Sequence, residues 1–223
     1  MNFHIITIFP NIFDSYINES IIKLAQENGH INIRTYDLRN WTTDKHNTVD
    51  DTPYGGGAGM LMKIEPLYKA IKEVKKSIKS KKIKTILLSA KGKRWDQQLA
   101  QNYSEKLNDI ILICGRYEGV DERILNFIDE EISIGDFVLT GGEIGALTIL
   151  DSISRLLPGV LGNSESSISE SHSKKNLLEY PQYTRPEIFK VNNKEYIVPP
   201  VLLSGNHKKI EEWRKNNQKI KEK

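Results

Sequence analysis

Five short runs rich in Ile, Val and Leu constrain most strongly what this chain can fold into. The predicted strands are Phe3–Phe9, Ile31–Tyr36, Ile83–Ser89, Ile110–Cys114 and Ile132–Ile134, with an alternative in which the last continues through Phe137–Leu139. Several of them are almost continuously apolar, which is typical of parallel strands buried on both faces of a sheet. Helical patterns separate the runs. Alternating strands and helices predict an α/β fold.

Four helices are predicted between these strands. They cover residues 13–24, 66–80, 97–107 and about 143–157. The apolar face of the first is formed by Phe13, Ile17, Ile21 and Leu24. Asn28-Gly29 follows as a stop signal, Pro66 opens the second helix, and Asp96 is placed to cap the third.

The composition changes after Gly162, which predicts a boundary between a domain of residues 1–162 and the rest. Residues 163–176 are mostly polar, as in a flexible interdomain linker. Residues 177–223 are expected to form a small, mostly helical C-terminal domain, partly extended over Tyr180–Ser204 and ending in a helix over His207–Lys223. From Gly159 onward 12 Lys/Arg stand against 8 Asp/Glu, which suits either a polyanionic partner or an ordinary solvated surface.

Several classes of protein are disfavoured by the same sequence. No stretch approaches the roughly 18 apolar residues of a membrane span, and the N-terminus has no basic region of a signal peptide. The single cysteine, Cys114, lies in an apolar strand and is interpreted as a core residue of a cytoplasmic protein. The five histidines are scattered, so no metal site is predicted.

Glycines follow three of the predicted strands, in Ser89–Gly92, Gly115–Gly119 and Gly135–Gly142. Because parallel strands present their carboxyl ends at one edge of a sheet, these loops are expected to converge there. Glycine lets a ligand approach main-chain N–H and C=O groups closely. Together the loops predict a site for a nucleoside-type ligand, although each one alone is also a common strand-to-helix turn.

Two frequent nucleotide-binding motifs are missing. No GxxxxGK[ST] sequence is present, which argues against an ATPase or GTPase. Thr7–Asn11 stands where a GxGxxG turn would follow the first strand, which argues against a dehydrogenase and a Rossmann-type methyltransferase.

The Gly55–Gly59 run is either a flexible connector or, with Tyr54 beside it, a loop that closes on a base. The lysines of Lys72–Lys82 are interpreted as a solvated helix face rather than an RNA site.

Six longer motifs occur in order along the chain. They are Asp51–Met60, Gly115–Arg123, Ser133–Glu143, Arg155–Gly162, Tyr180–Pro186 and Pro200–His207. From Phe3 to about Trp213 the chain closely resembles the bacterial tRNA (guanine-N1)-methyltransferases, which modify the guanosine immediately 3′ of the anticodon, at position 37. The resemblance implies a SPOUT fold, in which a parallel sheet carries a C-terminal trefoil knot, a rare exception to unknotted topology. It also implies a homodimer with the active site at the subunit interface.

The resemblance further implies that S-adenosylmethionine is the methyl donor, leaving S-adenosylhomocysteine, and that it binds in the knot. Carried over position by position, its contacts are Leu88, Ser89, Gly115, Tyr117, Glu118, Gly119, Ile134, Gly135, Asp136, Phe137, Val138, Leu139, Gly141 and Gly142. These are the three glycine loops that the strand ends predict. Ala90 departs from the proline that is usual in the family.

Guanine chemistry and the resemblance together give the catalytic candidates. N1 of guanine carries a proton at neutral pH, so methylation needs a base near N1 and a cation near O6, where negative charge develops. By resemblance the cation is Arg155, although its spacing also allows an ion pair with Asp151. The base is Glu170 by resemblance, where the family has Asp, with Glu179 as the fallback. The resemblance leaves open whether Mg²⁺ assists the transfer.

The tRNA contacts are likewise implied by resemblance. They are Asp51 and Tyr54, which precede the Gly55–Gly59 loop, and Gly57 and Gly59 within it. Arg185 of the C-terminal domain is a candidate for a phosphate contact, with ordinary surface charge as the alternative. The target base must leave the anticodon stack to be reached. Further candidates for phosphate contacts are Lys208, Lys209, Arg214 and Lys215. Two other functions stay open on the sequence: a SPOUT methyltransferase acting on a ribose or on ribosomal RNA, and a non-catalytic RNA-binding dimer.

Overall fold

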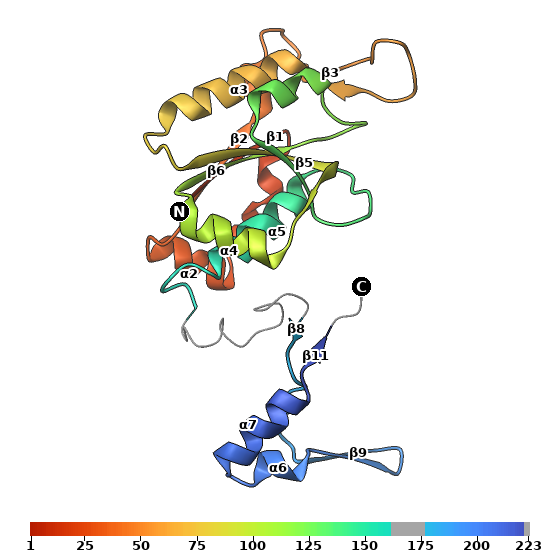
Figure 1. Cartoon of the computed structure of the whole chain (residues 1–223). Coiled ribbons are helices and arrows are strands. Elements are labelled where there is room, and N and C mark those ends of the chain that lie inside the picture. The colour runs from red at the N-terminus through yellow and green to blue at the C-terminus, as the bar shows by residue number, and fades with distance from the viewer. Residues whose placement is uncertain (162–176, 221–223) are drawn as a thin grey trace. The chain divides into compact units, whose positions relative to one another are not determined.

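Residues 1–161 and 177–220 are described by a computed structural model of the chain (Figure 1). The chain divides into two units, Met1–Gly162 and Asn163–Lys223, each described here by itself. Glu170, the candidate base, lies outside the described residues, as does the whole of the predicted linker. No helix in the described ranges is long and apolar enough to cross a membrane.

A five-stranded parallel sheet runs through the first unit, which confirms the predicted α/β class. Its strands, in spatial order, are β2 (Asn32–Asp37), β1 (Asn2–Thr7), β6 (Asp109–Cys114), β5 (Ile83–Arg94) and β7 (Glu130–Ser133). Strand β6 is buried along its whole length. Its side chains alternate between the two faces, with Leu112 in one apolar cluster and Ile111 and Ile113 in the other. Burial on both faces explains why the strand sequences are continuously apolar.

Helices cover both faces of this sheet (Figure 1). On one face lie α2 (Ser20–Glu27), α4 (Gln97–Lys106) and α5 (Glu143–Ser154), and on the other lies α3 (Ile64–Ser77). The shorter elements are η1 (Pro10–Ile12), α1 (Asp14–Ile17), η2 (Leu38–Trp41), η3 (Glu122–Phe127) and the antiparallel pair β3 (Asp50–Asp51) and β4 (Leu61–Met62). This arrangement leaves the carboxyl ends of the strands open to a ligand.

The predicted first helix is interrupted, and half of its predicted apolar face is wrong. Helix α2 starts afresh at Ser20, whose φ of 50° lies in the left-handed region. The break rotates the helix face, so Ile22 and Ala25 are buried, whereas Ile21 and Leu24 are 41% and 55% exposed. Helical spacing alone could not reveal this break.

The other helix signals act largely as predicted. Helix α2 ends before Asn28-Gly29, where the glycine has a φ of 74°. The Asp96 carboxylate accepts a hydrogen bond from the Leu99 N–H at 2.9 Å and so caps α4. Helix α3 starts at Ile64, earlier than predicted, and it tolerates Pro66 because N–H groups of a first turn have no intrahelical acceptor.

Strand β5 is longer than predicted and includes the expected turn Ser89–Gly92. Both Leu88 and Lys93 pair with Ile132 of β7, across a shift in register. A Cβ atom on Gly92 would lie 2.5 Å from backbone atoms of β7. Glycine therefore serves here to let two strands approach, not to turn the chain.

The second unit contains less helix than predicted. Within residues 177–220 it comprises β8 (Leu177–Leu178), β9 (Ile188–Val191), β10 (Lys194–Ile197), α6 (Pro200–Leu203), α7 (His207–Asn216) and β11 (Lys219–Ile220). Strands β9 and β10 form an antiparallel hairpin in the segment expected to be extended. The predicted final helix ends early because β11 pairs with β8 instead. None of the described residues of this unit is buried.

Candidate functional site

A cavity of about 440 Å³ lies where the glycine loops after β6 and β7 meet residues 88–91 of β5. Ligands of parallel α/β sheets bind at this carboxyl edge. The predicted cofactor residues that line it are Leu88, Ser89, Gly115, Tyr117, Glu118, Gly119, Ile134, Gly135, Phe137, Val138, Leu139, Gly141 and Gly142. Asp136 does not line the cavity, and its carboxylate instead pairs with Arg94 at 3.3 Å. The lining also includes residues that sequence reasoning missed, among them Lys91, Glu122 and Glu131.

Residues 134–142 pass tightly against the ends of two neighbouring strands. The N–H of Gly142 donates to the carbonyl of Gly115 at 2.9 Å. A Cβ atom on Gly142 would lie 2.7 Å from Cα of Cys114 and 2.9 Å from Cβ of Leu88. Only glycine fits at this crossing, which brings the loop after β7 onto the ends of β5 and β6.

The predicted continuation of β7 through Phe137–Leu139 is wrong. The strand ends at Ser133, whose hydroxyl donates to the carbonyl of Gly135 at 2.8 Å and accepts from its N–H at 3.3 Å. This local bonding offers the backbone an alternative to the sheet ladder and turns the chain. Phe137 and Val138 are 55% and 87% exposed. The segment is therefore a loop along the cavity.

A charged network that the sequence did not reveal holds this loop in place. Arg116 Nε donates to Glu143 Oε2 at 3.0 Å, and its Nη1 donates to the carbonyl of Thr140 at 3.2 Å. Glu143 is 1% exposed, and its other oxygen accepts from the Thr7 hydroxyl at 2.8 Å. The ring of Phe9 lies 4.6 Å from the guanidinium. Both charged residues fall in long motifs, but no spacing rule links residues so far apart.

The charges around the cavity favour a cationic ligand. Its lining contains the carboxylates of Glu118, Glu122 and Glu131 and the cations Lys91 and Arg116. Both cations are paired, Arg116 with Glu143 at 3.0 Å and Lys91 with Glu122 at 3.5 Å, so neither offers a strong anion site for a phosphate. The volume falls within the roughly 300–1,000 Å³ of small-molecule pockets.

Two residues near the cavity have raised pKa values. Burial raises the pKa of the Cys114 thiol far above its usual range, with the Glu143 carboxylate acting in the same direction. Cys114 is fully buried and protonated, which confirms its prediction as a core residue. Burial, and then the Asp50 carboxylate, raise the pKa of the Tyr117 hydroxyl. Neither side chain is poised as a base or a nucleophile.

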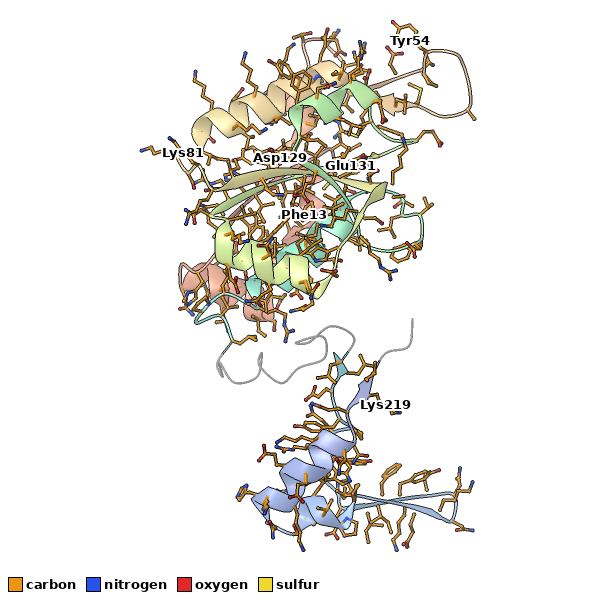
Figure 2. All side chains as sticks on the ribbon, viewed as in Figure 1. Phe13, Tyr54, Lys81, Asp129, Glu131 and Lys219 are labelled. Carbon is orange, nitrogen blue, oxygen red and sulfur yellow. The ribbon has the colours of Figure 1, made fainter. Side chains whose placement is uncertain are left out.

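The Gly55–Gly59 loop is attached to the cavity wall. Gly59 has a φ of 85°, and a Cβ atom on it would lie 2.4 Å from Cγ of Glu118. The N–H of Glu118 donates to the carbonyl of Met60 at 3.1 Å. Gly57 has a φ of 123° with open space around it, and Tyr54 is fully exposed on the loop (Figure 2). Asp51, also exposed, lies in β3 just before the loop.

Arg155 lies at the end of α5 that is remote from the cavity. Gly142 and Glu143 begin this helix beside the cavity, and Arg155 forms its C-terminal cap. Twelve helical residues at 1.5 Å each separate the two ends by about 18 Å. Asp151, the alternative partner of Arg155, accepts a hydrogen bond from the Tyr16 hydroxyl at 2.9 Å. The structure therefore does not bring Arg155 to the cavity of its own chain.

The remaining described candidates belong to the second unit. Among them are Glu179 and Arg185, of which Arg185 is exposed and precedes a cis peptide bond to Pro186. Within the described ranges, no group of three or more His, Cys, Asp or Glu residues could hold a metal ion.

The chain is similar to known proteins over nearly its full length. The tRNA (guanine-1)-methyltransferase TrmD family matches residues 1–223. A tRNA (guanine-N(1)-)-methyltransferase of Clostridioides difficile strain 630 is 53% identical over 216 residues, covering 96% of this chain and 91% of the relative. The proteins of the same name from Citrifermentans bemidjiense and Mycoplasma capricolum are 50% and 51% identical, covering 98% and 99% of this chain and 85% and 88% of the relatives. The chain therefore belongs to the tRNA (guanine-1)-methyltransferase TrmD family.

Proposed function

We propose that this chain transfers a methyl group from S-adenosylmethionine to N1 of the guanosine at position 37 of tRNA. Methylation of guanine N1 in tRNA follows from the family to which the chain belongs. The donor, the position in the tRNA and the roles of single residues are the proposal. The observation that carries it is the convergence on one cavity of the glycine loops after β6 and β7 and of residues 88–91 of β5, at the carboxyl edge of the sheet.

The residues around the cavity fit S-adenosylmethionine. Glycines expose backbone N–H and C=O groups to an adenosine, Leu88 and Val138 offer apolar contacts, and the Glu118 carboxylate complements a sulfonium or an ammonium group. When bound, the cofactor supplies the electrophilic methyl group. We infer a trefoil knot here, because residues 134–142 cross the ends of β5 and β6 so closely. In this proposal residues 1–162 form the cofactor-binding domain.

Proton removal from guanine N1 falls to the chain's own residues. Glu170 is our proposed base, with Glu179 as the second candidate, and Arg155 stabilises the charge that develops on O6. Glu170→Ala is expected to abolish turnover and to leave cofactor binding intact. If that variant keeps near-normal rates, Glu179 becomes the candidate base. Glu179→Ala then tests this second assignment. No step is assigned to Mg²⁺, since the described residues offer it no cluster of ligands.

We infer that the active site is completed by a second copy of the chain. Arg155 is about 18 Å from the cavity end of its own helix α5, which is too far for it to act on a base beside that cavity. Exposed apolar side chains lie on the elements around α5, namely Phe9, Ile12, Tyr16, Ile21, Leu24 and Ile144. Such a patch is typical of a protein–protein interface. A two-fold dimer would bring the Arg155 end of one helix to the cavity of the other chain.

Mixed dimers test this arrangement directly. Gly115→Leu is expected to fill the cavity, and Arg155→Ala removes the cation, so each variant alone is inactive. Coexpression is expected to restore about a quarter of the normal activity, because half of the dimers are mixed and each mixed dimer keeps one intact site. A site within one chain predicts no recovery, since neither chain then carries a complete set of residues.

The tRNA contacts are assigned to the glycine-rich loop and to the second unit. Gly59 packs against Glu118 of the cavity wall, and Asp51, Tyr54 and Gly57 lie on or beside the same loop, where the target guanine and its neighbour would enter. In this proposal residues 163–176 link the domains, and residues 177–223, with Arg185, bind the tRNA. A tRNA substrate also places the enzyme in the cytoplasm.

Methylation of defined transcripts tests the function as a whole. Purified protein and S-adenosylmethionine are expected to place one methyl group on N1 of guanosine 37, located by mass spectrometry of nuclease fragments. A transcript with adenosine at position 37 is the matched control and should stay unmodified. Methylation of a ribose, of another guanosine or of ribosomal RNA would overturn the proposal, and cofactor binding without turnover would favour a non-catalytic RNA-binding dimer.

A further inference from the structure

Helix α3 carries a row of lysines that the site does not use. We call these six residues the lysine strip, and they are Lys69, Lys72, Lys76, Lys79, Lys81 and Lys82, all exposed. The first three are spaced so that they lie on one face of α3, and the others follow directly after the helix. From the sequence alone, Lys72–Lys82 are interpreted as an ordinary solvated surface.

The helix that presents the strip is fixed to the sheet. Its opposite face buries Leu67, Ala70, Ile71 and Val74 in the apolar cluster on that side of the sheet. At its far end, Lys75 donates to the carbonyl of Phe127 in η3 at 3.1 Å. Lys69, Lys72 and Lys76 therefore project from a rigid element with defined positions.

The charge of the strip is not balanced locally. Residues 64–82 contain seven lysines and two glutamates, so they carry +5 when the whole chain carries +3. Within the described parts of the chain, none of the strip lysines forms an ion pair. Glu73 instead accepts a hydrogen bond from Trp41 Nε1 at 2.9 Å. Lys72 and Lys76 are like charges one helical turn apart, which disfavours the helix unless an anion lies nearby.

The position of the strip relates it to the active site. Helix α3 follows β4, and Met62 of β4 donates its N–H to the carbonyl of Gly119 in the cavity wall at 3.0 Å. From that end α3 extends about 21 Å. Tyr54 on the glycine-rich loop and Lys81 lie near opposite ends of this layer (Figure 2). A long polyanion that enters at the loop can therefore reach the strip.

We propose that the lysine strip binds backbone phosphates of the tRNA at a distance from the nucleotide that is methylated. This inference rests on the proposed tRNA substrate and adds a second, sequence-independent contact to it. Lysine pairs with phosphate as a point charge, releases the counterions of the RNA, and makes affinity depend on salt. The contact would align the tRNA body without touching the reacting base.

A triple substitution tests the strip. Lys69→Gln, Lys72→Gln and Lys76→Gln together keep good helix formers on exposed positions. We expect the KM for full-length tRNA at 0.15 M salt to rise roughly tenfold or more, with kcat at saturating tRNA and cofactor affinity unchanged. The slope of log affinity against log salt should shrink by about 2 to 3.

The matched control removes the same charge elsewhere on the unit. Lys23→Gln, Lys93→Gln and Lys106→Gln replace three exposed lysines outside the strip and should leave the KM and the salt slope unchanged. Arginine at the three strip positions should restore tRNA affinity. An unchanged KM and slope in the strip variant, a fall in its kcat, or an equal effect of the control would overturn the inference. If the unmodified protein fails to methylate tRNA, the proposed function itself has failed.

Discussion

The two units of this chain bury their residues very differently. The first unit has an apolar cluster on each face of its sheet, and its cavity is shaped by backbone contacts that only glycine allows. The second has no buried residue within 177–220, and its aromatic contacts, such as Tyr180 and Tyr183 beside Trp213, are half-exposed or exposed. Precise positioning of a cofactor needs a rigid scaffold, whereas phosphate contacts tolerate an open surface. The comparison predicts that substitutions in the first unit change chemistry and stability, and that those in the second change tRNA affinity.

The largest effect is expected at Arg155. Arg155→Ala should lower kcat at least about 100-fold while leaving the affinity for S-adenosylmethionine unchanged, because it removes a charge that acts on the transition state. Single-turnover kinetics and calorimetry measure the two quantities. Arg185→Ala in the second unit is the counterpart and should mainly raise the KM for tRNA. If Arg155→Ala raised only the KM for tRNA and left kcat unchanged, the expected contrast between the two units would be wrong.

The next effect is expected where the loop after β7 crosses the sheet. Gly142→Ala should weaken binding of S-adenosylmethionine by at least about tenfold, because the new Cβ would lie 2.7 Å from the Cys114 backbone. Gly115→Ala is the matched control, since its Cβ would meet its nearest neighbours at 3.5 and 3.7 Å. Calorimetric titration compares the two variants. Equal affinities would mean that the crossing is not tightly packed.

A smaller effect is expected when side chains of the two units are truncated and the stability is compared. Leu112→Ala in the fully buried strand β6 should reduce the free energy of unfolding by about 2–5 kcal/mol. Ile197→Ala in β10, where the side chain is 55% exposed, should change it by less than about 0.5 kcal/mol. Denaturant titration followed by circular dichroism measures both. A large decrease in the free energy of unfolding for Ile197→Ala would show that packing stabilises the second unit more than the exposure of its side chains suggests.

The smallest effect is a pH dependence at the amino edge of the sheet. His4 is buried between Tyr36 and Asp109, and burial lowers its pKa despite the opposing effect of the Asp109 carboxylate. The unfolded chain binds this proton more readily, so stability should decline as the pH falls from about 6.5 through the folded-state pKa. His4→Gln should flatten that decline in thermal unfolding. Stability that rises on acidification would contradict the assignment.

Much of the first unit could be predicted from the sequence because local signals and tertiary packing agree there. The five strands were recognisable from apolar runs, and Asp96 and Asn28-Gly29 marked helix ends by their own chemistry. Two of the three expected glycine loops, those after β6 and β7, and with them most of the cavity lining, followed from the rule that strand ends converge. The motifs gave the family, which the comparisons confirm.

Other features depended on contacts between distant residues. Helical spacing placed Ile21 and Leu24 in the core, but a left-handed Ser20 turns them to the surface. The turn expected at Ser89–Gly92 is a strand because β7 pairs with it, and the final helix ends early because β11 pairs with β8.

By itself, the sequence determined the class of fold, the edge of the sheet that holds the cavity, and the family. Each of these depends on local composition or on contiguous motifs, which can be recognised without the structure. Only the tertiary structure decided that Arg116 is neutralised by a buried Glu143, that Gly142 must lack a side chain, and that Arg155 lies at the end of α5 remote from the cavity. These depend on which residues meet across the folded chain, and electrostatic and packing energies act through space, not along the sequence.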